Sequence, residues 1–487
     1  MPPTPDATAP GAAVPDRGRA DACPGALRLH AADDGALARV RLPGGLLTVR
    51  QILALADAAE ALGDGELETT SRGNVQLRGL ASHCGAELAE RLRAVGLLPS
   101  DTHERVRNIV ASPLAGLDAY GFADVQTWVR ELDARLCASD WAAGLSGKFL
   151  FALDDGRGDV AALDADVTLI AGSDGAALLR LGRAAYGRPV PAGQAVTAAL
   201  DAARAFLDAL RAGGRKAWHL REAPDLLPAG SVPLPAFAGA APAVGVVTGG
   251  ARAAGFLAAG AGADGSATDG LAMGGSATDG SATDGAATDG SATDGLAMGG
   301  SATDGSATDG AATDGSAMGG ATMGGLSVGM RFGRATAAQW RELAGACAGE
   351  VRLTPWRGAV LPGAPADRLP ALAAAGFRTA PGSPWERATA CTGLPGCAKS
   401  LADVRSDAAL ALDTAASTGG RPAVGLPVHW SGCERRCGHP AGRWVDVLAV
   451  GQGYRVTVNG PVAARVAVDV TNEEMAEAVA EARRTTK

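Results

Sequence analysis

An internal duplication constrains the fold of this chain more than any other feature of its sequence. Residues 36–80 read as a strand, a tight turn, a helix that opens at Thr48 and two short strands around Arg72. Residues 327–363 follow the same plan. The matching positions pair Arg331 with Arg41, Thr336 with Thr48, Gln339 with Gln51, Thr354 with Thr69, Arg357 with Arg72, Gly358 with Gly73 and Val360 with Val75. Two copies of one unit predict a chain built from two similar halves.

Each copy is followed by a stretch of mixed helix and strand, so the predicted class is α+β with added α/β domains. A chain of 487 residues is long enough for several domains. The predicted boundaries are a disordered tail over 1–24, a first α+β unit over 25–100, an α/β domain over 101–245, a low-complexity pentapeptide-repeat linker over 246–326, a second α+β unit over 327–381 and a second α/β domain over 382–487.

The linker is predicted from its composition. Between about Gly260 and Gly325 the chain repeats SATDG or AATDG, interrupted by LAMGG and SAMGG. Such a segment has too few bulky apolar residues to offset the entropy of ordering, which is typical of a flexible linker or an expanded surface loop.

Four of the eight cysteines lie in one segment near the end of the chain. Cys391 and Cys397 form C-x5-C, and Cys433 and Cys437 form C-x3-C. Soft thiolate ligands delivered as two close pairs favour an iron-sulfur cluster. Zinc is the main alternative, although its ligand pairs are usually spaced C-x2-C to C-x4-C, and two disulfides are a third option. A helix is predicted over Ala398 to Leu412, directly after Cys397, with its amide dipoles towards an anionic cluster.

Charge and hydropathy narrow the classes of partner. The formal net charge is −8 and the pI about 5.4, which argues against a nucleic-acid-binding surface. There is no run of about 20 apolar residues, so no membrane span is predicted. The opening residues are rich in Pro and Ala and lack a signal-peptide pattern, so a reducing cytoplasm is expected, where thiols stay free to bind metal.

The chain resembles the nitrite and sulfite reductase superfamily of siroheme and iron-sulfur enzymes over nearly its whole length. The matching pieces are RVRLPGG, ETTSRGNVQLRG, the Arg107-Asn108 element, GKF around Lys148, and the two cysteine pairs. The resemblance implies an internally duplicated nitrite/sulfite reductase-like fold, with two ferredoxin-like half-domains plus two α/β domains. It also implies a [4Fe-4S] cluster on Cys391, Cys397, Cys433 and Cys437.

Finer details resemble one branch of that superfamily, the precorrin-3B synthases. The matching pieces are LTPWRGAVLPG, AWHLRE and SGCERRCGHP. This resemblance implies oxygen-dependent hydroxylation and lactone formation on precorrin-3A in aerobic cobalamin biosynthesis, with molecular oxygen, an electron donor and a non-haem iron centre. The reductases generally have a second basic residue two places after the lysine matched by Lys148, and this chain has Leu150 there. Losing that cation favours a tetrapyrrole substrate over a siroheme cofactor.

The predicted substrate-binding residues come from the family positions. Arg binds carboxylates in a planar, bidentate way, and a precorrin carries many of them. His439, two residues after Cys437, is the candidate catalytic residue, because histidine ligates iron or transfers protons. The predicted substrate-binding set is Arg39, Arg41, Arg72, Asn74, Gln76, Arg78, Arg107 and Lys148.

Two other functions fit the same pattern. The first is a siroheme-dependent, ferredoxin-type sulfite or nitrite reductase, in which the tetrapyrrole is a cofactor. The second is a non-catalytic iron-sulfur or zinc protein that only binds a tetrapyrrole. In the synthase and in the reductase alike, the cofactor supplies the redox chemistry, while the protein supplies binding and electrostatics.

Overall fold

The fold comes from a computed structural model of the chain. It describes residues 23–228, 230–234, 237, 241–249, 323–417, 425–440, 442–460 and 468–484. The predicted tail over 1–24 and the pentapeptide repeat therefore lie almost wholly outside the described residues.

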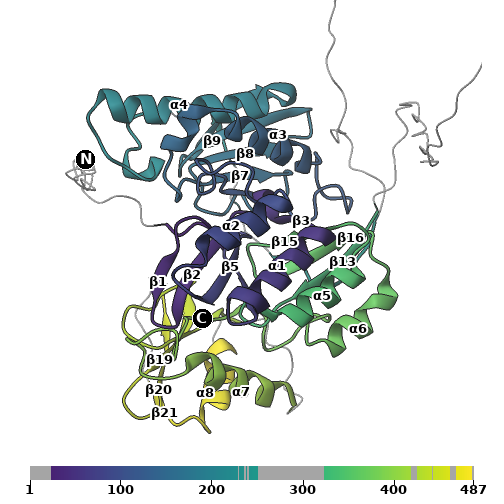
Figure 1. The fold of residues 1–487 in the computed structure, drawn as a ribbon, viewed down its shortest axis with the longest axis vertical. Coiled ribbons are helices and arrows are strands. Elements are labelled where there is room, and N and C mark those ends of the chain that lie inside the picture. Colours follow the sequence, from purple (N-terminus) through teal and green to yellow (C-terminus); the bar gives the residue numbers. More distant parts are fainter. Residues whose placement is uncertain are drawn as a thin grey trace, which may run out of the picture. The chain divides into compact units, whose positions relative to one another are not determined.

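The first half-domain is an antiparallel sheet backed by two helices (Figure 1). A capping box opens its first helix, because the Thr48 side chain accepts the Gln51 amide and the Gln51 side chain accepts the Thr48 amide. Its elements are β1 (His30–Ala32), β2 (Gly35–Val40), β3 (Leu46–Thr48), α1 (Val49–Leu62), β4 (Glu66–Thr69), β5 (Val75–Leu80) and α2 (Gly85–Ala94).

The second half-domain repeats this plan and confirms the duplication. Thr336 and Gln339 form the same capping box at the start of its helix, which is 10 residues long against 14 in the first copy. Its elements are β12 (Gly245–Val247), β13 (Gly325–Gly329), β14 (Arg334–Thr336), α5 (Ala337–Ala346), β15 (Glu350–Leu353), β16 (Gly358–Pro362) and α6 (Leu369–Ala374).

The two half-domains exchange strands. The strand that precedes each helix pairs with the sheet of the other half, so that β14 lies beside β4 and β3 lies beside β15. Figure 1 shows α1 and α5 side by side, and these helices pack on each other. Leu47, Ile52, Trp340 and Val351 from both halves are fully buried in one common hydrophobic core. The two halves are therefore a single packed unit.

Strand register corrects one part of the predicted alignment. Thr69 pairs with Val75 in the first hairpin, and Leu353 pairs with Ala359 in the second. Arg357 therefore matches Gly73, one position away from the predicted match with Arg72. Gly73 has φ +68° and Arg357 has φ +62°, a left-handed conformation that costs a residue with a side chain roughly 1–2 kcal/mol. The prediction aligned two identical Arg-Gly pairs, but those pairs occupy different turn positions.

The first α/β domain has a six-stranded sheet in the order β11-β10-β9-β8-β7-β6. Strands β6, β7 and β8 are parallel and the others are antiparallel. Helices α3 and α4 pack against each other and against this sheet. The elements are β6 (Ile109–Ala111), α3 (Gln126–Cys137), β7 (Phe151–Asp154), β8 (Val167–Ala171), β9 (Ala176–Leu181), β10 (Tyr186–Pro191), α4 (Ala195–Ala212) and β11 (Val232–Pro233).

The second α/β domain has a five-stranded sheet in the order β17-β18-β19-β20-β21. Strands β17, β18 and β19 are parallel, while β20 and β21 return antiparallel. The elements are β17 (Ala388–Ala390), α7 (Val404–Ser417), β18 (Val428–Ser431), β19 (Trp444–Ala449), β20 (Tyr454–Asn459), β21 (Val468–Val470) and α8 (Met475–Arg484).

The residues that flank the repeat lie side by side. Strands β12 and β13 form an antiparallel pair in which Val247 faces Gly325. The repeat therefore joins two neighbouring strand ends. No helix in the described parts of the chain is long and apolar enough to cross a bilayer.

Candidate functional site

The topology of the last sheet brings the two cysteine pairs together. Cys391 directly follows β17, and Cys433 follows β18 after one further residue, Gly432. These strands are parallel neighbours, so their carboxyl ends meet at one edge of the sheet. The Gly432 amide donates a hydrogen bond to Cys391 Sγ at 3.2 Å, which links the two loops at the sulfur itself.

The environment of Cys391 suits a bound thiolate. Burial raises the pKa of this thiol, while the amides of Gly432 and Gly393 and the charge of Arg405 lower it, and the neighbouring Cys433 raises it. Metal coordination removes the proton in any case. The two loops thus already hold hydrogen-bond donors and a cation close to one of the predicted ligands.

The spread of the thiols bears on the choice between zinc and a cluster. A zinc tetrahedron with Zn–S bonds of about 2.3 Å places its sulfurs roughly 3.8 Å apart. Among the described residues the three-membered groups of possible ligand atoms within 4.8 Å of one another include none of the cysteines. The described cysteines therefore do not form a closed zinc tetrahedron as they stand.

The helix predicted directly after Cys397 begins later, so that prediction is wrong. Helix α7 begins at Val404, because Asp403 caps it by accepting hydrogen bonds from the amide and hydroxyl of Ser406. Leu401 in the intervening turn instead donates its amide to the Gly432 carbonyl. The amide of Gly432, not the end of a helix, therefore faces the nearest thiol.

The first half-domain holds the cysteine loop at three points that the sequence did not indicate. The Ala398 amide donates to the carboxylate of Asp33, and Arg78 reaches the Gly396 carbonyl. Arg405, which donates to the Cys391 carbonyl, forms an ion pair with Glu68 of β4 at 3.1 Å. The acidic partners come from a distant part of the chain, so only the folded structure reveals these contacts.

Two histidines lie beside the cysteines. His439 is exposed and stacks on Trp444, with Nδ1 donating to the Pro440 carbonyl, so its Nε2 is the nitrogen left for a ligand. His429 on β18 is fully buried, contacts Thr389 through Nδ1 at 2.8 Å, and has no partner for Nε2 among the described residues. Burial lowers the pKa of His429 to about 3, so its ring is neutral. His429 was not among the predicted site residues, although it lies on a buried strand four residues before Cys433.

Several other buried polar atoms lack a partner within the described residues. Buried unpaired polar groups are rare in folded proteins and call for an explanation such as a bound group. These atoms include Glu68 Oε2, Arg357 Nη1, His429 Nε2 and Ser431 Oγ. Glu68 and Arg405 both affect the pKa of Arg357, and Arg357 in turn lowers that of His429, so these side chains lie near one another.

Four of the predicted basic residues lie near one another in the first half and the first α/β domain. Arg39 donates to Gln76, and Arg72 donates to the Lys148 carbonyl at 3.1 Å. Arg41 is buried against the carbonyls of Arg105 and Gly147. Burial lowers the pKa of Arg41 to about 10, with further contributions from the charges of Arg39 and Arg72.

Their charges remain largely uncompensated. Lys148 Nζ lies 3.7 Å from the centre of the Trp218 ring, a cation–π contact. Among the described residues no carboxylate lies within ion-pair distance of Arg39, Arg41, Arg72 or Lys148. Arg41 is buried, while Arg39, Arg72 and Lys148 are partly buried. Cations withdrawn from water without carboxylate partners favour an anionic ligand at this place.

The other predicted substrate residues are engaged within the protein. Arg107 forms a two-pronged ion pair with Asp133 at 2.6 Å, and Arg78 forms one with Asp34 at 2.8 Å. Asn74 accepts the Leu42 amide and donates to Asn108. These contacts join strands and loops, and they leave few donors for a substrate.

Leu150 lies in an apolar setting. Its side chain is buried among Val110, Ala152 and Val160, and its amide donates to Asp166. A charged residue at this position would lose its hydration without gaining a partner from these apolar neighbours. The second cation of the reductases is therefore absent from the structure as well as from the sequence.

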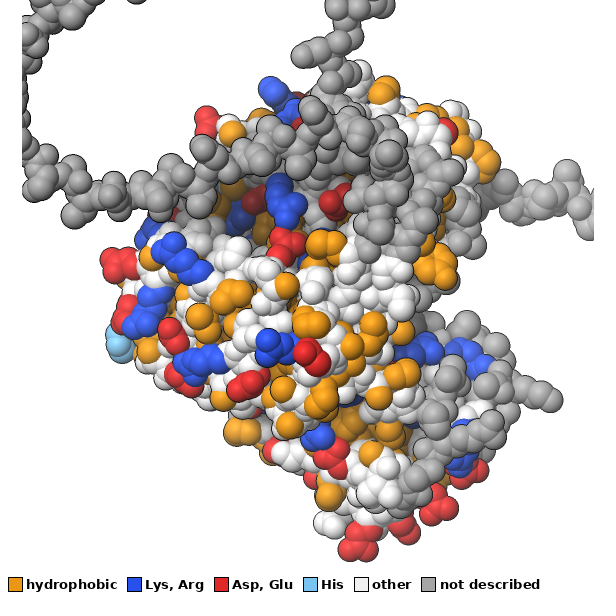
Figure 2. All heavy atoms as spheres, turned by 90° about the vertical axis from the view of Figure 1, so that its right-hand side faces the viewer, with side chains coloured by type: hydrophobic (Ala, Val, Ile, Leu, Met, Phe, Trp, Pro, Cys, Tyr) orange, Lys and Arg blue, Asp and Glu red, His pale blue; other side chains and the backbone are white. Residues whose placement is uncertain are grey.

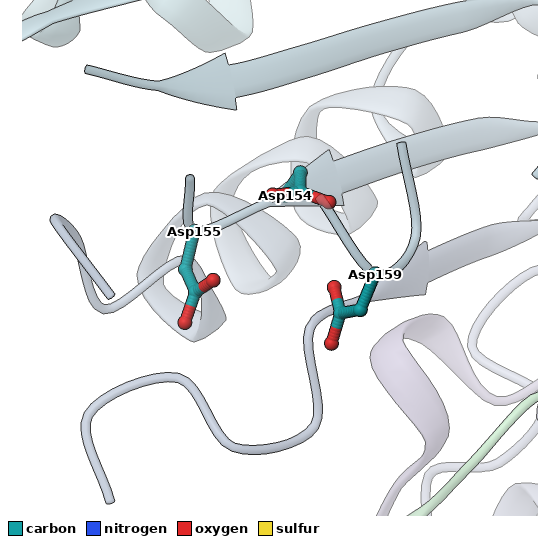
Figure 3. Close-up of side chains that lie close together, drawn as sticks. All are labelled: Asp154, Asp155 and Asp159. Carbon is teal, nitrogen blue, oxygen red and sulfur yellow. The ribbon is translucent and has the colours of Figure 1, made fainter. Parts of the chain in front are cut away.

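Three carboxylates meet after β7, where Asp154, Asp155 and Asp159 lie close together (Figure 3). Asp154 accepts the amides of Gly156, Gly158 and Ala161, and Asp155 pairs with Arg157. The group thus holds its own loop in shape.

A separate pocket of about 260 Å³ lies in the second half. Its arginines are already paired, Arg331 with Asp413, Arg334 with Glu66 and Arg405 with Glu68. Ligand pockets usually measure about 300–1,000 Å³, so this one is small for a tetrapyrrole. On the coloured part of the face in Figure 2, basic and acidic side chains are interspersed with hydrophobic ones, without a uniformly basic patch.

Both half-domains match the model of a known protein family. The model of the nitrite/sulfite reductase ferredoxin-like half domain matches residues 30–95 and 320–375. A ferredoxin–nitrite reductase from Synechococcus elongatus is 39% identical over 127 residues, 25% of each chain. A precorrin-3B synthase from Sinorhizobium sp is 36% identical over 152 residues, 31% of this chain and 32% of that protein. The matched segments thus span a quarter to a third of these relatives.

The whole fold has a solved counterpart. The NirA protein of Mycobacterium tuberculosis superposes with a TM-score of 0.58 and 17% identity, over 91% of this chain and 79% of that one. The predicted fold class, an internally duplicated α+β fold with two ferredoxin-like half-domains, is thereby confirmed.

Proposed function

We propose, for a chain whose two half-domains belong to the nitrite/sulfite reductase ferredoxin-like family, the reaction of a precorrin-3B synthase. That reaction is oxygen-dependent hydroxylation and lactone formation on precorrin-3A in aerobic cobalamin biosynthesis. The environment of Leu150 carries the proposal, because the position of the second reductase cation is taken by a side chain buried among apolar residues. The match to a precorrin-3B synthase from Sinorhizobium sp gives independent support.

The remaining cations suit a substrate with many carboxylates. Arg39, Arg41, Arg72 and Lys148 keep their charges free of carboxylate partners among the described residues. Guanidinium groups bind carboxylates with two parallel hydrogen bonds, so the three arginines can orient a tetrapyrrole by its rim.

The cysteine loops suit a [4Fe-4S] cluster on Cys391, Cys397, Cys433 and Cys437. A cluster with a neighbouring non-haem iron supplies electron transfer and oxygen activation when bound. The Gly432 amide stabilises the thiolate of Cys391, and Arg405 supplies a nearby positive charge. His439 offers Nε2 at the exposed side of the site, where it can accept a proton or a metal ion.

The proposal is tested with anaerobically purified protein, a reductant, precorrin-3A and ¹⁸O-labelled oxygen. The expected product carries one labelled oxygen atom in its new hydroxyl group, and its mass matches the lactone. Turnover without label in the product, or no product at all, contradicts the proposal.

A siroheme-dependent nitrite or sulfite reductase is the alternative function. It is favoured by the 39% identity to a ferredoxin–nitrite reductase. It predicts that protein reconstituted with siroheme reduces nitrite or sulfite to ammonia or sulfide with a chemical electron donor. The precorrin-3B synthase proposal predicts no such turnover.

A further inference from the structure

Arg357 occupies a backbone position that a residue with a side chain adopts only at a cost. It lies at the turn between β15 and β16, where the first half-domain has Gly73, and both residues have positive φ. The Thr354 amide donates to the Gly358 carbonyl as the Thr70 amide donates to the Asn74 carbonyl, so the two turns are equivalent. Non-glycine residues held in this conformation tend to be found at functional sites.

The side chain of Arg357 passes close to Gly333, where a larger residue would clash with it. A Cβ atom added to Gly333 would lie 3.0 Å from Cβ and Cδ of Arg357 and 2.8 Å from the Thr69 carbonyl oxygen. Gly333 thus leaves the space through which Arg357 runs past the first half-domain.

Arg357 is partly exposed as a residue, but the Nη1 end of its guanidinium is buried and forms no ion pair among the described residues. Its Nη1 has no hydrogen-bond partner within the described part of the chain. The nearby carboxylate of Glu68 is already paired with Arg405, and no ion pair joins Glu68 to Arg357. Burial lowers the pKa of Arg357, with a smaller opposing effect from Glu68, but guanidinium groups remain charged in proteins. A buried cation of this kind needs an anion to offset its desolvation.

The position of Arg357 relates it to the cysteine centre. Its Cβ and Cδ lie against Gly333, whose carbonyl accepts the Thr69 amide. The residue before Thr69, Glu68, pairs with Arg405, which donates to the Cys391 carbonyl. Arg357 therefore lies on the second-half side of the site, whereas Arg39, Arg41, Arg72 and Lys148 lie on the first-half side and the first α/β domain.

We propose that Arg357 is a substrate-binding residue that takes a carboxylate of the bound tetrapyrrole next to the cysteine centre. This inference rests on the proposed function, because it assumes a tetrapyrrole ligand. Arg357 would add a contact from the second half-domain, so that both half-domains would bind the same molecule. This role also explains why an arginine with strained backbone and unpaired charge occupies a position where glycine serves in the first copy.

The test is the Arg357→Gly variant, which restores the residue found at the equivalent turn. Because the variant removes both backbone strain and a buried unpaired charge, its melting temperature is expected to equal or exceed that of the wild type. Its affinity for uroporphyrin III, a stable tetrapyrrole with eight carboxylates, is expected to fall about 10-fold or more, as measured by fluorescence quenching with the anaerobically purified full chain.

Arg387→Gly is the matched control. Arg387 also has positive φ, at +57°, but it is exposed and donates to the Gly425 carbonyl. This variant relieves the same kind of backbone strain and is expected to bind uroporphyrin III as the wild type does.

The outcomes separate this inference from the proposed function. If the wild type binds uroporphyrin III and Arg357→Gly binds it equally well, the assignment of Arg357 is wrong and the proposed function stands. A fall of several degrees in melting temperature, or loss of iron with unchanged porphyrin affinity, also overturns the assignment, because Arg357 would then support the fold or the cluster. If the wild type binds no porphyrin, both proposals fail.

Discussion

Single side chains in the candidate site differ in whether the protein already compensates their charge. Arg78 and Arg107 are paired with Asp34 and Asp133, whereas Arg72 donates only to a backbone carbonyl. The sequence identified all three through family position, but it could not sort them. Their partners depend on packing between distant segments, and no local pattern records that.

This sorting predicts opposite effects for two arginine substitutions. Arg107→Ala leaves a partly buried Asp133 without its cation and is expected to lower the free energy of unfolding by about 2 kcal/mol. Arg72→Ala is expected to change it by less than about 1 kcal/mol and instead to weaken tetrapyrrole binding. Urea denaturation and porphyrin titration measure both quantities. Equal destabilisation by the two substitutions would contradict the distinction between Arg107, which is paired within the protein, and Arg72, which is available to a ligand.

The acidic group after β7 gives a pH prediction. Burial, together with the charges of Asp154 and Asp155, raises the pKa of Asp159 to about 8. The ordinary value is about 3.9, so between about pH 4 and pH 8 the folded state binds more protons than the unfolded state, and stability falls as the pH rises through this window.

Asp159→Asn replaces the protonated carboxyl with a neutral amide and removes this loss. The variant is expected to gain about 1–2 kcal/mol on the wild type between pH 5 and pH 8. Asp164→Asn is the control, because its carboxyl is partly exposed and the hydrogen bond from Arg183 lowers its pKa, so its effect is flat over this range. Unfolding by urea at several pH values measures the difference, and parallel curves for Asp159→Asn and wild type would refute the assignment.

Helices were predicted well where the signal is local. The capping residues Thr48 and Thr336 predicted both helix starts. The helix after Cys397 was misplaced because the prediction overlooked the capping residue Asp403. The exchange of β3 and β14 between the halves could not be predicted, because strand pairing between distant segments leaves no local trace.

The shared core of the two halves makes the two helix caps equivalent. Thr48→Ala and Thr336→Ala are each expected to lower the free energy of unfolding by about 1 kcal/mol and to do so in one common transition, since α1 and α5 pack together. Thr197→Ala is the control, because Thr197 is exposed within α4 and caps no helix. Two separate unfolding transitions, each sensitive to only one cap, would contradict a common core.

On the scale of the whole molecule, the repeat joins two strands that already pair. Because Val247 faces Gly325, a short turn can replace residues 250–322 without moving the strands. Closing a shorter loop costs less entropy, so this replacement is expected to stabilise the protein by roughly 2 kcal/mol and to leave iron content and porphyrin affinity unchanged. Thermal unfolding and iron analysis check this, and loss of either ligand would give the repeat a role in the site.

The two half-domains together determine which charged side chains lie near the cysteine segment. Arg78 of the first half contacts the loop that carries Cys391 and Cys397, and Glu68 pairs with Arg405 of α7, which donates to the Cys391 carbonyl. Arg357 belongs to the second half and lies against Gly333. The spacing of the four cysteines suggested them as ligands, whereas their contacts with the first half depend on packing between distant segments. The proposed cluster and the proposed tetrapyrrole would therefore be neighbours in one site.

Metal and pigment analysis of the anaerobically purified protein distinguishes an iron-sulfur enzyme with a tetrapyrrole substrate from an enzyme with a siroheme cofactor. For the proposed function we expect about four or more irons per chain, a broad iron-sulfur absorption that bleaches on reduction, and no siroheme in an acid–acetone extract. Stoichiometric siroheme in the extract would make the tetrapyrrole a cofactor and contradict the proposed function, and zinc in place of iron would contradict both enzyme assignments.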